Sequence, residues 1–427
     1  MTAYLGVVGN DFILNGKHSD LNAEDIYGPL TIPVFGRGVV YDVPNAKLME
    51  QKKFIKFGLT QEALVQHVPL IEREVLNYIK SSPRLKGSNG DIEITKAMAE
   101  ITIFTAARTL QGAEVRNKLT DEMAKLYHDL DMGFQPINFL LPWAPLPHNH
   151  RRDIARDKMN AIYKAIIDKR RALSEEEEVE REPDMIWNLM QCRYRDGDPL
   201  PDDVIANIMI ALLMAGQHAS SAGGSWIILR LASQPEITEE LYQEQVQVLG
   251  KELPPLRYED LDKLPLLMSV VKETLRIHSS IVAILRKVTK PLSVPGTPYV
   301  VGTDKVLLAA PSVSAMDDKY FTNGETWNPH RWLSRDDEDE GAETIDYGYG
   351  EVSKSSRSPY LPFGAGRHRC IGEKFAYINL GVIVATLVRN FRFYTLDGSK
   401  GIPDTDYTSL FAMPKRPAVI RWERRNP

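Results

Sequence analysis

The spacing of apolar positions predicts that most of the chain is helical. Between residue 46 and about residue 130, apolar side chains recur three and four positions apart, as in "EALVQHVPLIEREVLNYI" (62–79). This is the period of one helix face. The same spacing predicts four later helices, over 201–232, 236–250, 265–278 and 371–390.

Strand-like segments are short and lie in four parts of the chain. Residues 1–45 read as strands and turns, beginning with a hairpin whose turn lies near Gly9 and Asn10. Short strands are also expected over 283–289 and 305–312, with a closing hairpin over 407–422. Four prolines within 134–150 prevent a continuous helix and predict an apolar loop. The expected fold class is therefore α+β, mainly α with small β-sheets at one edge.

Composition narrows the class of protein. With 52 basic and 57 acidic residues the net charge is −5, so no nucleic-acid partner is implied. Apolar runs such as 208–216 reach half of the roughly 18 residues that a membrane span needs. Acidic stretches at 174–184 and 334–358 predict solvated loops. Because no repeat or linker divides the chain, a single domain over 1–427 is expected.

The two cysteines are too few for a disulfide framework, and this favours a reducing compartment. Cys192 is interpreted as a small buried apolar residue. Cys370 lies in "FGAGRHRCIG" (363–372), where three glycines permit positive φ and a close backbone approach to a flat ligand. The first turn of helix 371–390 and the cations at 367–369 would favour a thiolate. A single thiolate in such a setting suits an axial ligand of haem.

This segment resembles the haem-binding loop of cytochromes P-450, whose pattern is F-x-x-G-x-[R/H]-x-C-x-G. The matching residues are Phe363, Gly366, His368, Cys370 and Gly372, and Gly364 lies in the same loop. Two companion motifs, "KETLR" and "WNPHRWL", precede it in the family order. The resemblance implies a structural cluster of Glu273, Arg276 and Arg331. It also implies the cytochrome P-450 fold, with haem between a long distal helix and a proximal cysteine loop.

The motif "AGQHASS" resembles part of the distal helix of eukaryotic sterol 14α-demethylases. The resemblance implies that Gly216 leaves room for dioxygen and that His218 pairs with Asp131 to relay protons. At the next position the family has Thr or Ser, whereas this chain has Ala219. Ser220 is the alternative hydroxyl, although one residue along a helix turns by about 100°. Proton delivery is therefore expected to be impaired, and Ala219→Thr is expected to raise the coupling of NADPH use to product.

Further residues match the fungal sterol 14α-demethylase (lanosterol 14α-demethylase) branch. Those implied to bind the haem propionates are Tyr27, Lys52 and Arg286, a phenol and two cations. Those implied to surround the sterol are Thr31, Phe35, Tyr41, Phe134, Pro136, Ala215, Ser409, Leu410 and Phe411. Residues 282–285 read V-A-I-L where the family usually has H-S-I-M, which predicts a more apolar pocket wall.

By this resemblance the chain is a haem-thiolate monooxygenase of ergosterol biosynthesis. It would remove the 14α-methyl group of a sterol such as lanosterol or eburicol in three oxidations and release formate. The implied cofactor is haem b, and NADPH would supply electrons through cytochrome P-450 reductase, which would dock near Arg367, Arg369 and Lys374. Azole inhibitors are implied ligands, and a monomer is expected.

The resemblance also implies attachment to the endoplasmic reticulum membrane, on its cytoplasmic face, through an N-terminal anchor and hinge that the sequence is expected to lack. Two other hypotheses stay open. One is a paralogue that oxidises another sterol or lipid, motivated by Ala219 and the segment 282–285. The other is a haem- and sterol-binding protein that does not turn over.

Overall fold

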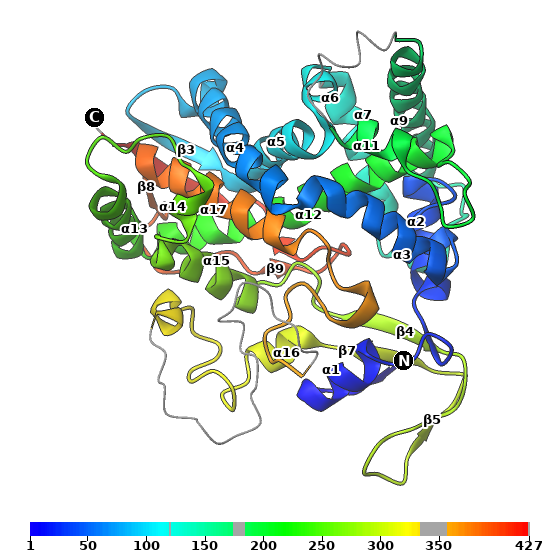
Figure 1. Ribbon diagram of the computed structural model, residues 1–427. Helices are drawn as coiled ribbons and strands as arrows, with labels where there is room; N and C mark the ends of the chain where they lie inside the picture. The colour runs from blue at the N-terminus through cyan, green and yellow to red at the C-terminus, as the bar shows by residue number, and fades with distance from the viewer. Residues whose placement is uncertain (119–120, 174–183, 334–356, 426–427) are drawn as a thin grey trace.

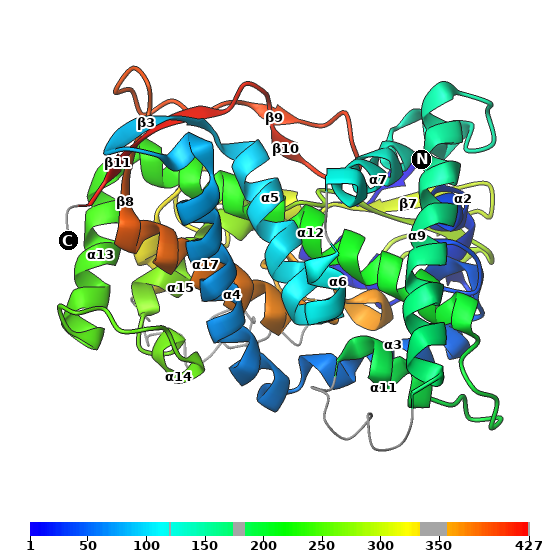
Figure 2. The ribbon, with the colours of Figure 1, turned by 90° about the horizontal axis from the view of Figure 1, so that it is seen from above.

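One long helix, α12 (Asp202–Ser233), runs through the middle of the protein in the computed structural model (Figures 1 and 2). The structure describes residues 1–118, 121–173, 184–333 and 357–425. Within these residues α12 is the one helix long and apolar enough to span a membrane, but most of its apolar stretch is buried. A helix that is apolar on all sides and covered by protein belongs to a core.

The other helices surround α12. They are α1 (Gly6–Leu14), α2 (Glu24–Phe35), α3 (Asn45–Lys56), α4 (Gln61–Ser81), α5 (Ile94–Ala106), α6 (Ala113–Asn117), α7 (Asp121–Asp131), α8 (Ile137–Leu140), α9 (Pro147–Arg171), α11 (Met185–Gln191), α13 (Pro235–Leu249), α14 (Tyr258–Leu261), α15 (Pro265–Ile277), α16 (Pro311–Ala315) and α17 (Glu373–Asn390). The predicted helices at 201–232, 236–250, 265–278 and 371–390 are thereby confirmed as α12, α13, α15 and α17.

Four small sheets lie around the helices. Strands β1 (Thr2–Ala3), β7 (Val306–Ala309), β4 (Ile284–Val288) and β2 (Leu21–Asn22) form a sheet in this order, with β1 parallel to β7 and the other pairs antiparallel. Strands β3 (Asn89–Glu93), β11 (Val419–Arg424) and β8 (Phe391–Tyr394) form an antiparallel sheet near α13 (Figure 2). Two-stranded pairs join β5 (Leu292–Ser293) to β6 (Val300–Val301) and β9 (Thr405–Asp406) to β10 (Met413–Pro414).

The prediction that residues 1–45 form strands and turns is mostly wrong. The expected hairpin is mostly the helix α1, because Val7, Asn10 and Ile13 form its buried face. Asn10 interrupts the apolar pattern, and its amide donates to the Ser314 hydroxyl at 3.1 Å. Residues 24–35 form the helix α2, where strands and turns were expected. Two prolines in this helix, Pro29 and Pro33, are the reason why its sequence does not predict a helix.

The hairpin predicted over 407–422 exists, but its bounds are wrong. The hairpin is made by β9 and β10, whereas β11 continues into the other sheet and pairs with β3 and β8. The apolar loop predicted over 134–150 contains the short helix α8 and ends where α9 begins. The acidic stretches at 174–184 and 334–358 lie almost wholly outside the described residues.

A small apolar core connects the four-stranded sheet to the loop that carries Cys370. It contains Ile13 and Leu14 of α1, residues of β2, β4 and β7, and the buried loop residues Leu361 and Ala365. The sheet lies with α1 and α16 at one end of the molecule (Figure 1). The cysteine loop is therefore fixed by packing against elements that come from the far end of the sequence.

Candidate functional site

Cys370 lies in a loop between a 3-10 turn, Gly366–His368, and the helix α17. Its backbone N–H donates to the carbonyl of Phe363 at 3.0 Å, which closes the loop. Gly364 and Gly366 have φ of +68° and +67°, as predicted. Gly372 has φ of −90° and is the N-cap of α17, so the prediction of positive φ is wrong there.

The glycine at 366 allows the loop to touch α1. A Cβ atom at this position would overlap the carbonyl oxygen of Leu14, the last residue of α1. At Gly364 a Cβ would meet only the Cδ1 atom of Ile284, at an ordinary 3.5 Å. The cysteine loop is thus held between α1 on one side and β4 on the other.

The Cys370 side chain is exposed by surface area, yet burial among protein atoms raises the pKa of its thiol. We infer that its accessible surface opens on a space inside the molecule and not on bulk solvent. The Gly372 N–H and the cations of Lys52 and Arg369 act in the opposite direction and lower this pKa. These groups favour the thiolate as expected, but burial has the larger effect on the thiol pKa when the sulfur binds no metal.

Two of the three expected cations contribute little for identifiable reasons. Arg369 is paired with Glu373, with Nη2 2.6 Å from Oε2. Burial and the neighbouring cations Arg286, Lys52 and Arg367 lower the pKa of His368 to about 3, so this imidazole is neutral. Cys370 also precedes α17 by three residues and does not lie in its first turn.

Two cations, Arg286 and Lys52, lie beside the cysteine loop. Arg286 is buried in β4 and donates to the Leu285 carbonyl at 2.8 Å. Lys52 of α3 donates to the carbonyls of Arg367 and Arg369 at 2.9 and 3.4 Å. Within the described part of the chain, neither cation forms an ion pair with a carboxylate. Tyr27 lies at the same place, and its hydroxyl accepts the Leu285 N–H at 3.0 Å, which leaves its own proton free to donate.

These residues fit a haem group. Burying a cation without a counter-charge is costly, so the arrangement calls for an anion between Arg286, Lys52 and Tyr27. Two propionates are such anions, and the accessible sulfur of Cys370 lies beside the same cations, since Lys52 and Cys370 perturb each other's pKa. Among the described residues no group of three or more His, Cys, Asp or Glu side chains could hold a metal ion. A haem iron needs only one such ligand from the protein, and a single thiolate can supply it.

The middle of α12 exposes two methyl groups. Between residues 205 and 230 of this helix, Ala215 and Ala219 are its exposed side chains, one turn apart on the same face. Ser220 is 4% exposed and lies off that face, so the expectation that it replaces the missing hydroxyl is wrong. A Cβ at Gly216 would meet Leu110 and Ala106, so the side of the helix where this glycine lacks a side chain faces α5 and its continuation. The glycine allows close packing of these helices, which is a different role from the expected room for dioxygen.

One segment links this face of α12 to the cysteine loop. The Ser280 hydroxyl donates to the Ala219 carbonyl at 3.4 Å, and Ile284 lies against Gly364. Four residues of chain span at most about 14 Å. The segment from Ser280 to Ile284 therefore connects the exposed face of α12 to the loop that carries Cys370.

His218 and Asp131 meet as the sequence predicts. Nε2 of His218 lies 3.3 Å from Oδ1 of Asp131, without hydrogen-bond geometry. Burial lowers the pKa of His218 and the Asp131 charge raises it, with burial prevailing, so the ring is neutral. Phe411 stacks on the ring at 5.1 Å between centroids, and Phe134 meets its edge at 6.2 Å.

Several of the predicted substrate residues join this aromatic group. Phe35 contacts Phe134, with centroids 5.8 Å apart, and Phe134 contacts Phe411 at 5.7 Å. Tyr41 stacks on Tyr27 at 5.4 Å, and burial raises its pKa to about 12. Of the other four residues, Leu410 is half-buried and Pro136 and Ser409 are exposed, whereas Thr31 is buried with its hydroxyl bonded to the Tyr27 carbonyl. The Thr31 hydroxyl proton is therefore already used and cannot be donated to a substrate.

The predicted cluster of Glu273, Arg276 and Arg331 forms in the core. Oε1 of Glu273 lies 2.8 Å from Nη2 of Arg276 and 3.0 Å from Nε of Arg331. The side chains of Glu273 and Arg276 are wholly buried. Sequence reasoning missed that the Trp332 indole also donates to this carboxylate, at 2.9 Å, although the residue lies in the quoted "WNPHRWL" motif.

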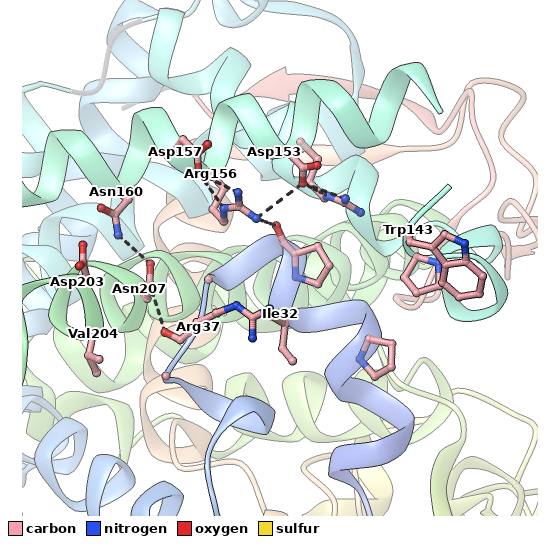
Figure 3. A pocket seen from close by; sticks show the side chains of 16 residues that line it. Ile32, Arg37, Trp143, Asp153, Arg156, Asp157, Asn160, Asp203, Val204 and Asn207 are labelled. Carbon is pink, nitrogen blue, oxygen red and sulfur yellow. Dashed lines mark hydrogen bonds and ion pairs between the residues drawn. The ribbon is translucent and has the colours of Figure 1, made fainter. Parts of the chain in front are cut away.

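A surface pocket of about 980 Å³ lies elsewhere, between α2, α9 and the start of α12 (Figure 3). Its ions pair with one another: Arg156 lies within 3.8 Å of both Asp153 and Asp157. Asn207 is held between Asn160 and the Arg37 carbonyl (Figure 3). Among the residues that line it are none of the predicted catalytic or cofactor residues, so it is not the chemical site.

Comparison with known proteins agrees with this geometry. The sequence model of the family described as Cytochrome P450 matches residues 11–422. A sterol 14-alpha demethylase of Gibberella zeae is 64% identical over 428 residues, which is 100% of this chain and 84% of that protein. One of Aspergillus flavus is 63% identical over 430 residues, covering 100% and 83%. An eburicol 14-alpha-demethylase of Penicillium italicum is 61% identical over 429 residues, again covering 100% and 83%.

A solved structure supports the fold independently. A retinoic acid-bound cyanobacterial cytochrome P450 superposes with a TM-score of 0.82 at 19% identity, over 99% of this chain and 89% of that one. At this sequence identity the structural similarity supports the fold alone. Together with the full-length match to the demethylases, it leads to one conclusion: the chain belongs to the cytochrome P450 family, and within it to the sterol 14-alpha demethylases.

Proposed function

We propose that this chain is a haem-thiolate monooxygenase that removes the 14α-methyl group of a sterol such as lanosterol or eburicol, in three successive oxidations that end in release of formate. The observation that carries the proposal is the exposed Cys370 beside the buried Arg286 and the half-buried Lys52, for which the described residues supply no carboxylate partner. The names of relatives 61–64% identical over the whole chain supply the substrate class.

Each residue near the cysteine loop has a part in holding the cofactor. Cys370 would bind the haem iron through its sulfur, towards which the Gly372 N–H is directed. Arg286, Lys52 and Tyr27 would bind the propionates. When bound, the haem supplies the oxidation chemistry, and the protein positions the substrate and tunes the thiolate.

The sterol would lie against the exposed face of α12. Ala215 and Ala219 present only methyl groups there, and the half-buried Val282 and Ala283 continue an apolar wall. Phe134 and Phe411 enclose His218, so the aromatic group limits access of water to the imidazole. Asp131 lies beside His218 and is 39% exposed, so the pair can take protons from solvent on the carboxylate side.

Electrons would come from NADPH through cytochrome P-450 reductase on the side of the cysteine loop. Arg367 and Lys374 are exposed there, whereas Arg369 is paired with Glu373. We propose attachment to the cytoplasmic face of the endoplasmic reticulum membrane, a single catalytic domain, a monomer and inhibition by azoles, all from the family.

Incubation of the purified protein with its reductase, NADPH and either lanosterol or eburicol tests the function. The expected products are formate and the 14-demethylated diene. A different oxidised sterol would support the paralogue hypothesis, which the apolar residues at 282–285 motivate. Spectral binding of sterol with no oxidised product would contradict an enzymatic role. A Cys370→Ala variant is the matched negative control.

A further inference from the structure

The exposed face of α12 has no hydroxyl of its own. Its two exposed side chains at mid-helix are Ala215 and Ala219, and Ser220 is buried. His218 is enclosed by aromatic rings and is neutral. Protons that cross from His218 to the space before this face therefore need an O–H group from another element.

Ser280 places such a group at the required position. It is half-buried, and its Oγ donates to the backbone carbonyl of Ala219 at 3.4 Å, next to the residue whose own side chain is only a methyl group. This distance is at the long end of the hydrogen-bond range, so the bond is weak and easily exchanged for another acceptor.

The backbone around Ser280 is anchored on both sides. The preceding His278 stacks on Trp226 of α12 at 3.9 Å between centroids and accepts the Nε–H of Arg230 at 3.1 Å. The Ser280 carbonyl accepts the N–H of Ala412 at 2.8 Å, beside the ring of Phe411 that covers His218. Ser280 therefore lies between α12 and the segment that encloses the imidazole.

We propose that Ser280 supplies, from outside α12, the hydroxyl that the helix lacks at Ala219, and that it passes protons to the oxygen-binding side of the site. A serine relays a proton by giving up its own and accepting another, so it is unchanged at the end, and the proton comes from solvent through His218 and Asp131. The inference rests on the proposed function and deepens it, because it replaces the expectation of impaired proton delivery with a specific donor.

The first test is spectroscopic and needs no turnover. In the reduced holoenzyme under carbon monoxide, a hydroxyl beside the ligand changes the C–O stretching frequency in the infrared. Ser280→Ala is expected to shift this band by more than its width, and Ser280→Thr is expected to leave it in place. Ser279→Ala is the matched control, because the Ser279 hydroxyl is bonded to the Ile281 carbonyl.

The second test measures formate formed per NADPH consumed. Ser280→Ala is expected to lower this ratio by about tenfold or more, the scale of general acid catalysis. Ser279→Ala is expected to change it little. Ala219→Thr added to Ser280→Ala is expected to restore the ratio, because it returns a hydroxyl to this part of the site. This pattern would not arise if Ser280 were merely structural.

The outcomes separate the two proposals. If the parent protein forms no demethylated sterol but Ser280→Ala still shifts the infrared band, the proposed function fails and the placement of Ser280 stands. If the parent turns over and Ser280→Ala changes neither the band nor the ratio, the role of Ser280 is overturned.

Discussion

Substitution of Gly366 by alanine tests how the cysteine loop is held. The residue has φ of +67°, where an L-residue is destabilised by about 1–2 kcal/mol. Its new Cβ would also overlap the Leu14 carbonyl oxygen at the end of α1, and 3.1 Å would separate it from the carbonyl carbon. Relieving such an overlap by a backbone shift costs about 1–3 kcal/mol. The two effects together predict a loss of about 2–5 kcal/mol in the free energy of unfolding.

Gly398→Ala separates the two effects. Gly398 has nearly the same φ, +69°, and a Cβ there would meet nothing within 4 Å. This control should lose only the backbone term, about 1–2 kcal/mol. Urea denaturation of both variants gives the difference, and haem content after gel filtration shows whether the loop still binds the cofactor. Equal losses for the two variants would refute the claim that α1 supports the loop.

Three further predictions concern buried charges. Glu273→Ala leaves the wholly buried Arg276 without its carboxylate and should destabilise the protein by about 3–5 kcal/mol in urea denaturation. Asp404→Ala removes the exposed partner of Lys415 and should cost under about 1 kcal/mol. Burial, then the cations Arg230 and Arg276, lower the pKa of His278 to about 3. The contribution of neutral His278 to the free energy of unfolding is therefore complete above about pH 6.5 and is lost as the pH falls towards 3, because the unfolded chain binds a proton that the folded protein does not. His278→Gln should flatten this pH dependence in urea denaturation, and an unchanged slope would contradict the prediction. Arg286→Met should stabilise the haem-free protein and weaken haem retention; a fall in both would show that Arg286 has a partner in the protein.

The local motifs of the site could be predicted from the sequence. The positive φ of Gly364 and Gly366 follows from a short glycine-rich loop, and the pairing of Glu273 with Arg276 follows from their spacing on one helix. The meeting of His218 with Asp131 came from the family resemblance, since the two residues lie on different helices.

What the sequence could not provide depends on residues that are distant along the chain. The buried face of α1 includes Asn10, whose partner Ser314 lies 304 positions away, so the helical pattern was hidden. The weak field at Cys370 follows from the pairing of Arg369 with Glu373 and from the neutral His368. The approach of Ser280 to Ala219 is likewise a tertiary contact that no local pattern indicates.

The carbon monoxide difference spectrum of the reduced protein tests the central claim, that Cys370 is the thiolate ligand of haem. The protein itself and a Cys192→Ala variant should both give the red-shifted band of thiolate-ligated haem, because Cys192 is half-buried within the apolar core. Cys370→Ala should lose that band while keeping its secondary structure by circular dichroism. A red-shifted band that persists in Cys370→Ala would contradict the claim.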